Sequence, residues 1–132
     1  MLEAIPAWHV PNEWATIGPT LAKAIERDPC RDAWAVLDQA MSGDLDFWRV
    51  GGSLAGYLVT QTIGKTFWVI YVAGHGGSIN EKRELMTTVE QQARKAQCSE
   101  VKFEGRDWRK VFPDYSARQT PDGRWHFRKS IA

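Results

Sequence analysis

The chain has 132 residues, of which 43% are hydrophobic and 25% charged, and this composition suits one globular domain with a core of its own. No stretch approaches the roughly 20 apolar residues of a membrane span, and the start lacks the basic and apolar regions of a signal peptide. Cys30 and Cys98 are the only cysteines, so a Cys-x-x-Cys metal or redox pair is excluded, and two lone thiols fit a reducing compartment such as the cytoplasm.

The formal net charge of +1 is unevenly distributed along the chain. Residues 1–46 hold three basic and eight acidic residues, whereas residues 102–132 hold eight basic and four acidic ones. Two interpretations remain open. The two ends face each other in one fold, or the C-terminal part is a basic surface for an acidic partner or for head-to-tail self-assembly.

The first quarter of the chain predicts helices. Apolar residues at helical spacing predict a helix that begins after Asn12, with a kink or a break into two short helices at Gly18-Pro19. A second helix is predicted from Ala33 to Ala40 or Met41, with Trp34 and Leu37 in its apolar pattern. The seven tryptophans are expected mostly in the core or in subunit contacts, because large aromatic side chains dominate burial.

Three antiparallel strands are predicted next, over residues 45–50, 54–63 and 67–72, with turns at Gly51-Gly52 and Gly64-Lys65. They form a meander of hairpins.

A glycine-rich turn, Gly74-His75-Gly76-Gly77-Ser78, joins the third strand to a long helical pattern. The first turn of a helix carries backbone N–H groups without internal partners, and the helix dipole adds positive potential, so such a turn is a ready anion site. Glycines let phosphates approach the backbone closely. The alternative is a turn that only reverses the chain direction.

The helix after this turn is predicted over residues 79–97. Its start has capping-box spacing, because Ser78 stands three residues before Glu81. A strand over residues 101–103 follows, and the strand–helix–strand order predicts a right-handed crossover and parallel pairing with residues 67–72.

The end of the chain predicts a short helix over residues 108–112 and a hairpin. The hairpin strands are expected over residues 115–119 and 125–131, around the turn Pro121-Asp122-Gly123.

This order of elements resembles the fold of the GCN5-related N-acetyltransferases (GNAT) over nearly the whole chain. In that family the turn after the fourth strand binds the pyrophosphate of coenzyme A, with the motif Gln/Arg-x-x-Gly-x-Gly/Ala. The segment from Tyr71 to Gly76 keeps both glycines but has Tyr71 where the family has Gln or Arg. The resemblance implies one α/β domain over residues 1–132, with a mixed sheet of about six or seven strands flanked by helices.

The cofactor implied by the resemblance is acetyl-CoA or another acyl-CoA. The amides of four residues would receive its phosphates, and these are Gly74, Gly76, Gly77 and Ser78, with His75 inside the same turn. A backbone N–H near Val72 or Ala73 would polarise the thioester carbonyl if the strand is bulged there. An ordinary paired strand is the alternative.

No general base stands out. His75 has suitable chemistry near neutral pH, but its position is typical of a surface-loop histidine. Asp46 and Glu104, near strand ends, are more distant candidates, with solvated charge as the alternative. His126 shows no partner at a meaningful spacing. Tyr115 stands near the family's late aromatic position, yet no tyrosine matches the family's usual general acid. No metal constellation is expected.

A narrower resemblance concerns the segment from Gly105 to Tyr115, which is similar to small GNAT-like proteins of tailed phages and prophages. That group implies a degenerate cofactor turn. Two functions therefore remain open. One is an acyl-CoA-dependent N-acyltransferase with a small-molecule or protein amine as acceptor, and the other is a catalytically inert GNAT-fold assembly protein that forms homo-oligomers or binds a virion partner.

Aromatic and basic residues interleave near the C-terminus, as in sites for single-stranded nucleic acid. Strand alternation explains the same pattern in residues 124–131, with Trp125 and Phe127 inside and Arg124 and Arg128 outside. Nucleic acid is therefore not expected as a partner. A membrane is not expected either, because the chain lacks an apolar stretch long enough to span one.

Overall fold

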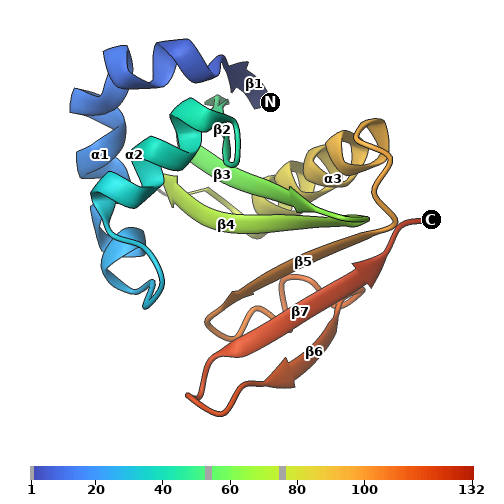
Figure 1. Ribbon diagram of the computed structural model, residues 1–132. Coiled ribbons are helices and arrows are strands. Elements are labelled where there is room, and N and C mark those ends of the chain that lie inside the picture. The colour runs from blue at the N-terminus through green and yellow to red at the C-terminus, as the bar shows by residue number, and fades with distance from the viewer. Residues whose placement is uncertain (1, 53–54, 75–76) are drawn as a thin grey trace. The chain divides into compact units, whose positions relative to one another are not determined.

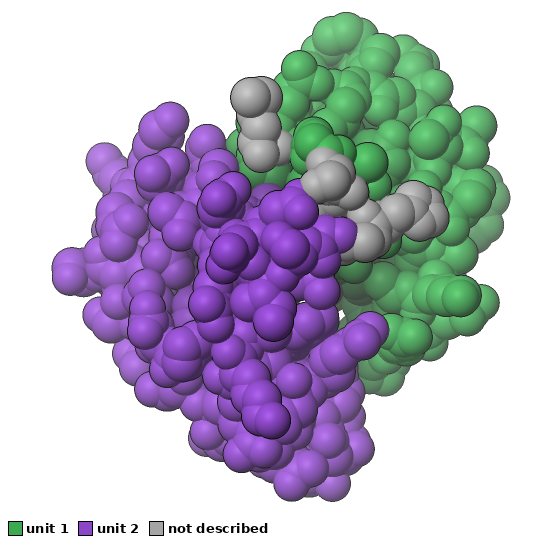
Figure 2. Space-filling view, turned by 180° about the vertical axis from the view of Figure 1, so that it is seen from behind, with its two compact units in different colours: residues 1–61, 71–76 green, residues 62–70, 77–132 purple. Residues whose placement is uncertain are grey.

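The computed structural model describes residues 2–52, 55–74 and 77–132 (Figure 1). The chain divides into two compact units, one of residues 1–61 and 71–76 and the other of residues 62–70 and 77–132 (Figure 2). The first unit contains β1 (Leu2–Ile5), a 3-10 helix (Ala7–His9), α1 (Val10–Glu26), α2 (Ala33–Ser42), β2 (Asp46–Val50) and most of β3 (Gly56–Ile63). The second contains α3 (Ile79–Lys95), β5 (Glu100–Gly105), β6 (Ser116–Gln119) and β7 (Trp125–Ser130). Strand β4 (Thr66–Gly74) is shared between them.

The strands form one mixed sheet of seven strands in the order β1-β2-β3-β4-β5-β7-β6. This confirms the predicted α/β fold with a mixed sheet of six or seven strands. Strand β1 was not predicted, although it pairs antiparallel with β2 from Leu2 opposite Val50 to Ile5 opposite Phe47. No helix in the described parts of the chain is long and apolar enough to cross a membrane.

Helix α1 is one helix from Val10 to Glu26 and contains Pro19, so a break into two short helices is wrong. It also starts earlier than the predicted Asn12 cap. Proline is tolerated in the first helical turn because that N–H has no helical partner anyway, and Pro11 lies there. Pro19 deprives the Ala15 carbonyl of its helical donor, but both residues are exposed, so water can replace that donor.

Helix α2 presents to the core a face that only partly matches the predicted one. The Asp32 side chain caps it by accepting from the Ala35 N–H, and Val36 and Ala40 are its buried residues. Trp34 and Met41 instead are 80% and 55% exposed. Trp8 is also exposed, and the other five tryptophans are partly buried, so none lies fully in the core. That tryptophans lie in subunit contacts, the alternative expectation, stays a prediction.

The second unit contains the predicted crossover. Strands β4 and β5 pair in parallel, from Thr66 opposite Glu100 to Val69 opposite Phe103. Strand β7 joins the other edge of β5 and then pairs with β6, which confirms the terminal hairpin. Its alternation is confirmed for Phe127 and Ile131, which are buried, and for Arg128, which is exposed, whereas Trp125 and Arg124 are both partly buried.

The short helix expected over residues 108–112 is replaced by hydrogen-bonded turns. The N–H groups of Val111 and Phe112 both donate to the Trp108 carbonyl. The Arg83 guanidinium of α3 then donates to the carbonyls of Lys110 and Val111, at 3.1 and 2.8 Å. These contacts tie the segment to α3 and satisfy its carbonyls without a helix.

A close backbone approach in the first unit depends on Gly56, the first residue of β3. A Cβ atom there would collide with the carbonyl oxygen of Ala73 near the end of β4. Gly56 therefore lets β3 lie tightly against the strand that leads into the glycine turn.

We expect Gly56→Ala to lower the free energy of unfolding by about 1–3 kcal/mol, because the added methyl group has no room beside the Ala73 backbone. Urea unfolding of the variant and the wild type measures this. Gly51→Ala is the matched control, since a Cβ at Gly51 meets nothing within 4 Å. Equal stabilities of all three proteins would contradict the close approach.

Candidate functional site

The predicted cofactor turn lies between β4 and α3. Val72 is 55% exposed, Ala73 is partly buried and Gly74 ends the strand. Gly77 has a φ of 90°, a left-handed conformation that favours glycine, and Ser78 is the N-cap of α3. His75 and Gly76, which were also predicted as cofactor-binding residues, lie outside the described residues.

The predicted capping box is present at the start of α3. The Glu81 N–H donates to the Ser78 hydroxyl at 3.1 Å, and the Ser78 N–H donates to the Glu81 carboxylate at 3.2 Å. Two N–H groups at the start of the helix are therefore already bonded, whereas those of Ile79 and Asn80 show no partner among the described residues. The Glu81 carboxylate also adds negative charge where a phosphate would lie, and an anionic ligand has to overcome it.

Two cationic side chains of the second unit lie over the ring of Trp108. The Lys82 ammonium is 5.2 Å and the Arg106 guanidinium 5.1 Å from the ring centroid. Such cation–π contacts orient the charged groups as well as stabilise them. Lys82 belongs to the first turn of α3, so it supplies positive charge next to Glu81.

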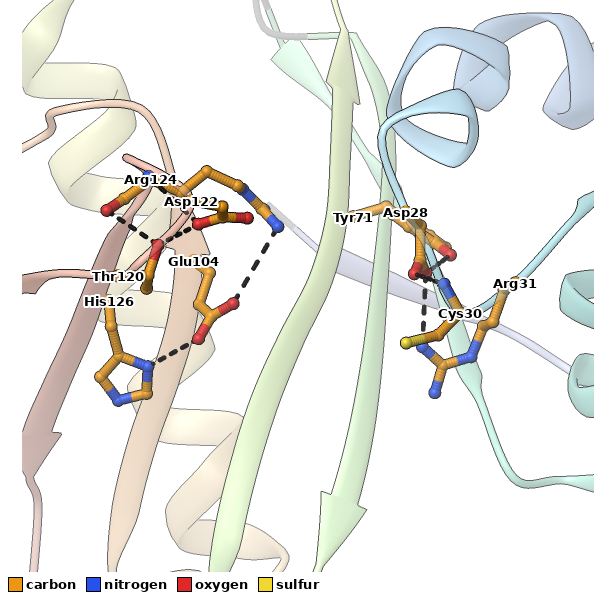
Figure 3. A network of polar contacts seen from close by, with 9 residues as sticks. All are labelled: Asp28, Cys30, Arg31, Tyr71, Glu104, Thr120, Asp122, Arg124 and His126. Atoms are coloured by element: carbon orange, nitrogen blue, oxygen red, sulfur yellow. Dashed lines mark hydrogen bonds and ion pairs between the residues drawn. The ribbon is translucent and has the colours of Figure 1, made fainter.

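Tyr71, which stands where the GNAT motif has Gln or Arg, donates its hydroxyl to the Asp28 carboxylate in the first unit (Figure 3). The Cys30 N–H donates to the same carboxylate at 2.8 Å, and Arg31 approaches it at 3.4 Å. Burial by itself would raise the Asp28 pKa, but these hydrogen bonds outweigh it and hold the pKa below its usual value. Burial and the neighbouring Asp28 raise the pKa of Tyr71.

Tyr115 is buried, and its hydroxyl donates to the Glu90 carboxylate of α3 at 2.7 Å. The Lys129 ammonium of β7 donates to the other oxygen of Glu90 at 3.1 Å. Burial, followed by the hydrogen bond to Glu90, raises the pKa of Tyr115. The hydroxyl is therefore engaged in joining α3 to the sheet and is not free to donate a proton to a ligand.

The two carboxylates proposed as distant bases differ in their surroundings. Asp46 is exposed at the start of β2, opposite Thr60. Glu104 accepts a hydrogen bond from His126 Nδ1 at 2.9 Å and lies 4.0 Å from the Arg124 guanidinium (Figure 3). Sequence reasoning missed this partner of His126 because the two residues are 22 positions apart and meet only through β5–β7 pairing.

Comparison with known proteins shows the fold. No family model matches the chain, and no curated protein matches it. Solved structures match over nearly the full length, at low sequence identity. An aminoglycoside 6′-acetyltransferase of type Ii has a TM-score of 0.72 and 8% identity, with 100% of this chain and 97% of that chain covered.

A protein of the GNAT family from Desulfovibrio desulfuricans has a TM-score of 0.67 and 14% identity, over 100% of this chain and 99% of that one. The PaiA N-acetyltransferase of Thermoplasma acidophilum, solved with coenzyme A, has a TM-score of 0.62 and 9% identity, over 99% of both chains. The chain therefore has the GNAT acetyltransferase fold.

We expect Glu81→Gln to strengthen binding of acetyl-CoA several-fold, because it removes a negative charge from the start of α3 while the amide still accepts from the Ser78 N–H. Isothermal titration calorimetry at low salt measures the change. Glu84→Gln, one turn further along the exposed side of α3, is the control and should change affinity less. Equal effects of the two variants would argue against a phosphate at the helix start.

We expect Tyr115→Phe to lower the free energy of unfolding by about 1–3 kcal/mol, because the buried Glu90 carboxylate loses its hydroxyl donor. Thermal or urea unfolding tests this. Tyr57→Phe serves as the control at a second buried tyrosine, one for which the described residues show no hydroxyl hydrogen bond. If both substitutions have the same small effect, the Glu90 contact does not contribute to stability.

Proposed function

We propose that this protein is an acyl-CoA-dependent N-acyltransferase. The observation that carries the proposal is the direct passage from β4 through a glycine turn to the capped start of α3, on a fold shared with acetyltransferases. Four of the matching structures contain coenzyme A. The acceptor is an amine, either of a small molecule or of a protein.

The residues at this turn suit the phosphates of a coenzyme A thioester. The amides of Gly74 and Gly77, together with the N–H groups of Ile79 and Asn80, would bind the phosphate oxygens, and the Ser78 N–H would join them on leaving the Glu81 carboxylate. The same predicted cofactor site includes Val72, Ala73, His75 and Gly76. Lys82 and Arg106 would balance the phosphate charge. The bound acyl-CoA supplies an electrophilic thioester carbon and a thiol leaving group.

A second function is favoured by other contacts of the chain. Tyr71 is bonded to Asp28 and lacks the cationic or amide group of the GNAT motif, and Glu81 opposes an anion at the helix start. The first unit also exposes Trp8, Trp34 and Met41, which would suit contact with another subunit. These observations favour a catalytically inert GNAT-fold protein that acts in assembly, as a homo-oligomer or bound to a partner such as a virion protein.

Solution mass and cofactor affinity, measured together, separate the two functions. A monomer that binds acetyl-CoA supports the acyltransferase. A stable oligomer without affinity for acetyl-CoA supports the assembly protein.

For the acyltransferase, we expect wild-type protein to bind acetyl-CoA in calorimetry and Gly74→Val to lose that binding, because a branched side chain would occupy the space of phosphate oxygens. Gly74 lies against Gly56 of β3, so the melting temperature is measured as well and acetyl-CoA affinity is compared per folded molecule. Gly51→Val, outside the turn, should bind normally. Absence of wild-type binding at millimolar acetyl-CoA would overturn the proposed function.

A further inference from the structure

Glu104 and His126 form a hydrogen-bonded pair on one face of the sheet in the second unit. They lie directly opposite each other in the antiparallel register of β5 and β7, so their side chains project from the same face. The distance between His126 Nδ1 and Glu104 Oε2 is 2.9 Å. The His126 side chain is only 12% exposed, whereas that of Glu104 is 37% exposed.

Neighbouring side chains hold the imidazole in place. The ring of Trp68 on β4 meets it edge-on, with the centroids 5.9 Å apart. The Arg124 guanidinium approaches the second oxygen of Glu104 at 4.0 Å. A carboxylate that accepts from Nδ1–H selects the tautomer in which Nε2 carries a lone pair, and this tautomer can take up a proton.

The position of the pair in the sheet suits a ligand. Parallel pairing of β4 with β5 ends at Val69 opposite Phe103, and Glu104 is the next residue of β5. The pair therefore lies at the carboxyl end of the paired parallel strands. In open α/β sheets, ligands bind outside the carboxyl ends of such strands.

We propose that His126 is the general base of the acyl transfer and that Glu104 is its positioning residue; this inference rests on the proposed function. His126 Nε2 takes the proton that the acceptor nitrogen loses as it attacks the thioester carbonyl carbon. The C–N bond forms and the C–S bond breaks. The imidazolium then gives the proton to the departing thiolate, so the products are an amide, free thiol and the neutral histidine.

Charged side chains from several elements surround the imidazole of His126. Glu104 and Lys102 come from β5, Arg128 from β7 and Arg124 from the turn before it, and Arg118 of β6 lies directly opposite His126 in the strand register. Lys102 also lies over the Trp68 ring, 5.5 Å from its centroid, and pairs with Glu100. Of these groups, the carboxylate of Glu104 is hydrogen-bonded to the imidazole.

The test compares His126→Gln with His9→Gln. Both histidines contact a carboxylate, since His9 Nε2 lies 3.1 Å from Glu13, but only His126 is at the proposed site. Acetyl-CoA affinity is measured by calorimetry, and thiol release is followed with spermidine, L-lysine and kanamycin as amine probes, and also with water alone. We expect His126→Gln to bind acetyl-CoA normally and to lose about 100-fold or more in kcat. His9→Gln should resemble the wild type.

The role of Glu104 is tested by the pH profile. Wild-type kcat should rise with pH as the imidazole loses its proton, and this rise should be absent in His126→Gln. In Glu104→Gln kcat should fall at every pH while acetyl-CoA affinity is kept, because the imidazole is no longer held in the tautomer with the Nε2 lone pair. Glu104→Asp should recover part of the loss. A merely structural pair would change the melting temperature without changing the profile.

Each failure has a distinct signature. Wild-type protein that does not bind acetyl-CoA overturns the proposed function itself. Equal kcat in the wild type and His126→Gln, with acetyl-CoA bound by both, overturns the base assignment and leaves the function standing. Cofactor binding without thiol release from any probe or water also overturns the assignment, because no reaction then needs a base.

Discussion

The parallel pairing of β4 with β5 is the constraint on which the rest of this structure depends. Parallel neighbours cannot be joined by a hairpin, so the chain must leave the end of β4, cross the sheet in α3 and return to begin β5. The start of α3 is thereby set just beyond the carboxyl end of β4, with Gly77 in a left-handed conformation before the cap. The same pairing sets Glu104 at the point where β4 and β5 stop pairing.

Two uses of the helix start compete in this chain. A capping box stabilises α3 by bonding the N–H groups of Ser78 and Glu81, but an anion needs unbonded N–H groups and no carboxylate nearby. Lys82 and Arg106, which lie over the Trp108 ring, add positive charge near the start of α3. The balance of these charges therefore affects how strongly an anion binds at the start of α3.

Much of the fold could be predicted from local pattern, and most of the errors arise where tertiary contacts decide. Helix α3 was predicted to within two residues because its cap and apolar stripe are both local. Strand β1 was missed because it has only four residues and is defined by its pairing with β2. The turns over residues 108–112 depend on Arg83, far away in sequence, and the Glu104–His126 pair depends on strand register. The glycines of the cofactor turn were visible from sequence, but the engagement of Tyr71 by Asp28 was not.

The central claim is that the start of α3 receives the phosphates of an acyl-CoA. Amide chemical shifts of the isotope-labelled protein during titration with acetyl-CoA test it most directly. The account predicts that the largest changes fall on Gly77, Ser78, Ile79 and Asn80, with a change at the Trp108 indole. An absence of shifts at millimolar acetyl-CoA, or shifts confined to the exposed face of α2 around Trp34, would contradict it.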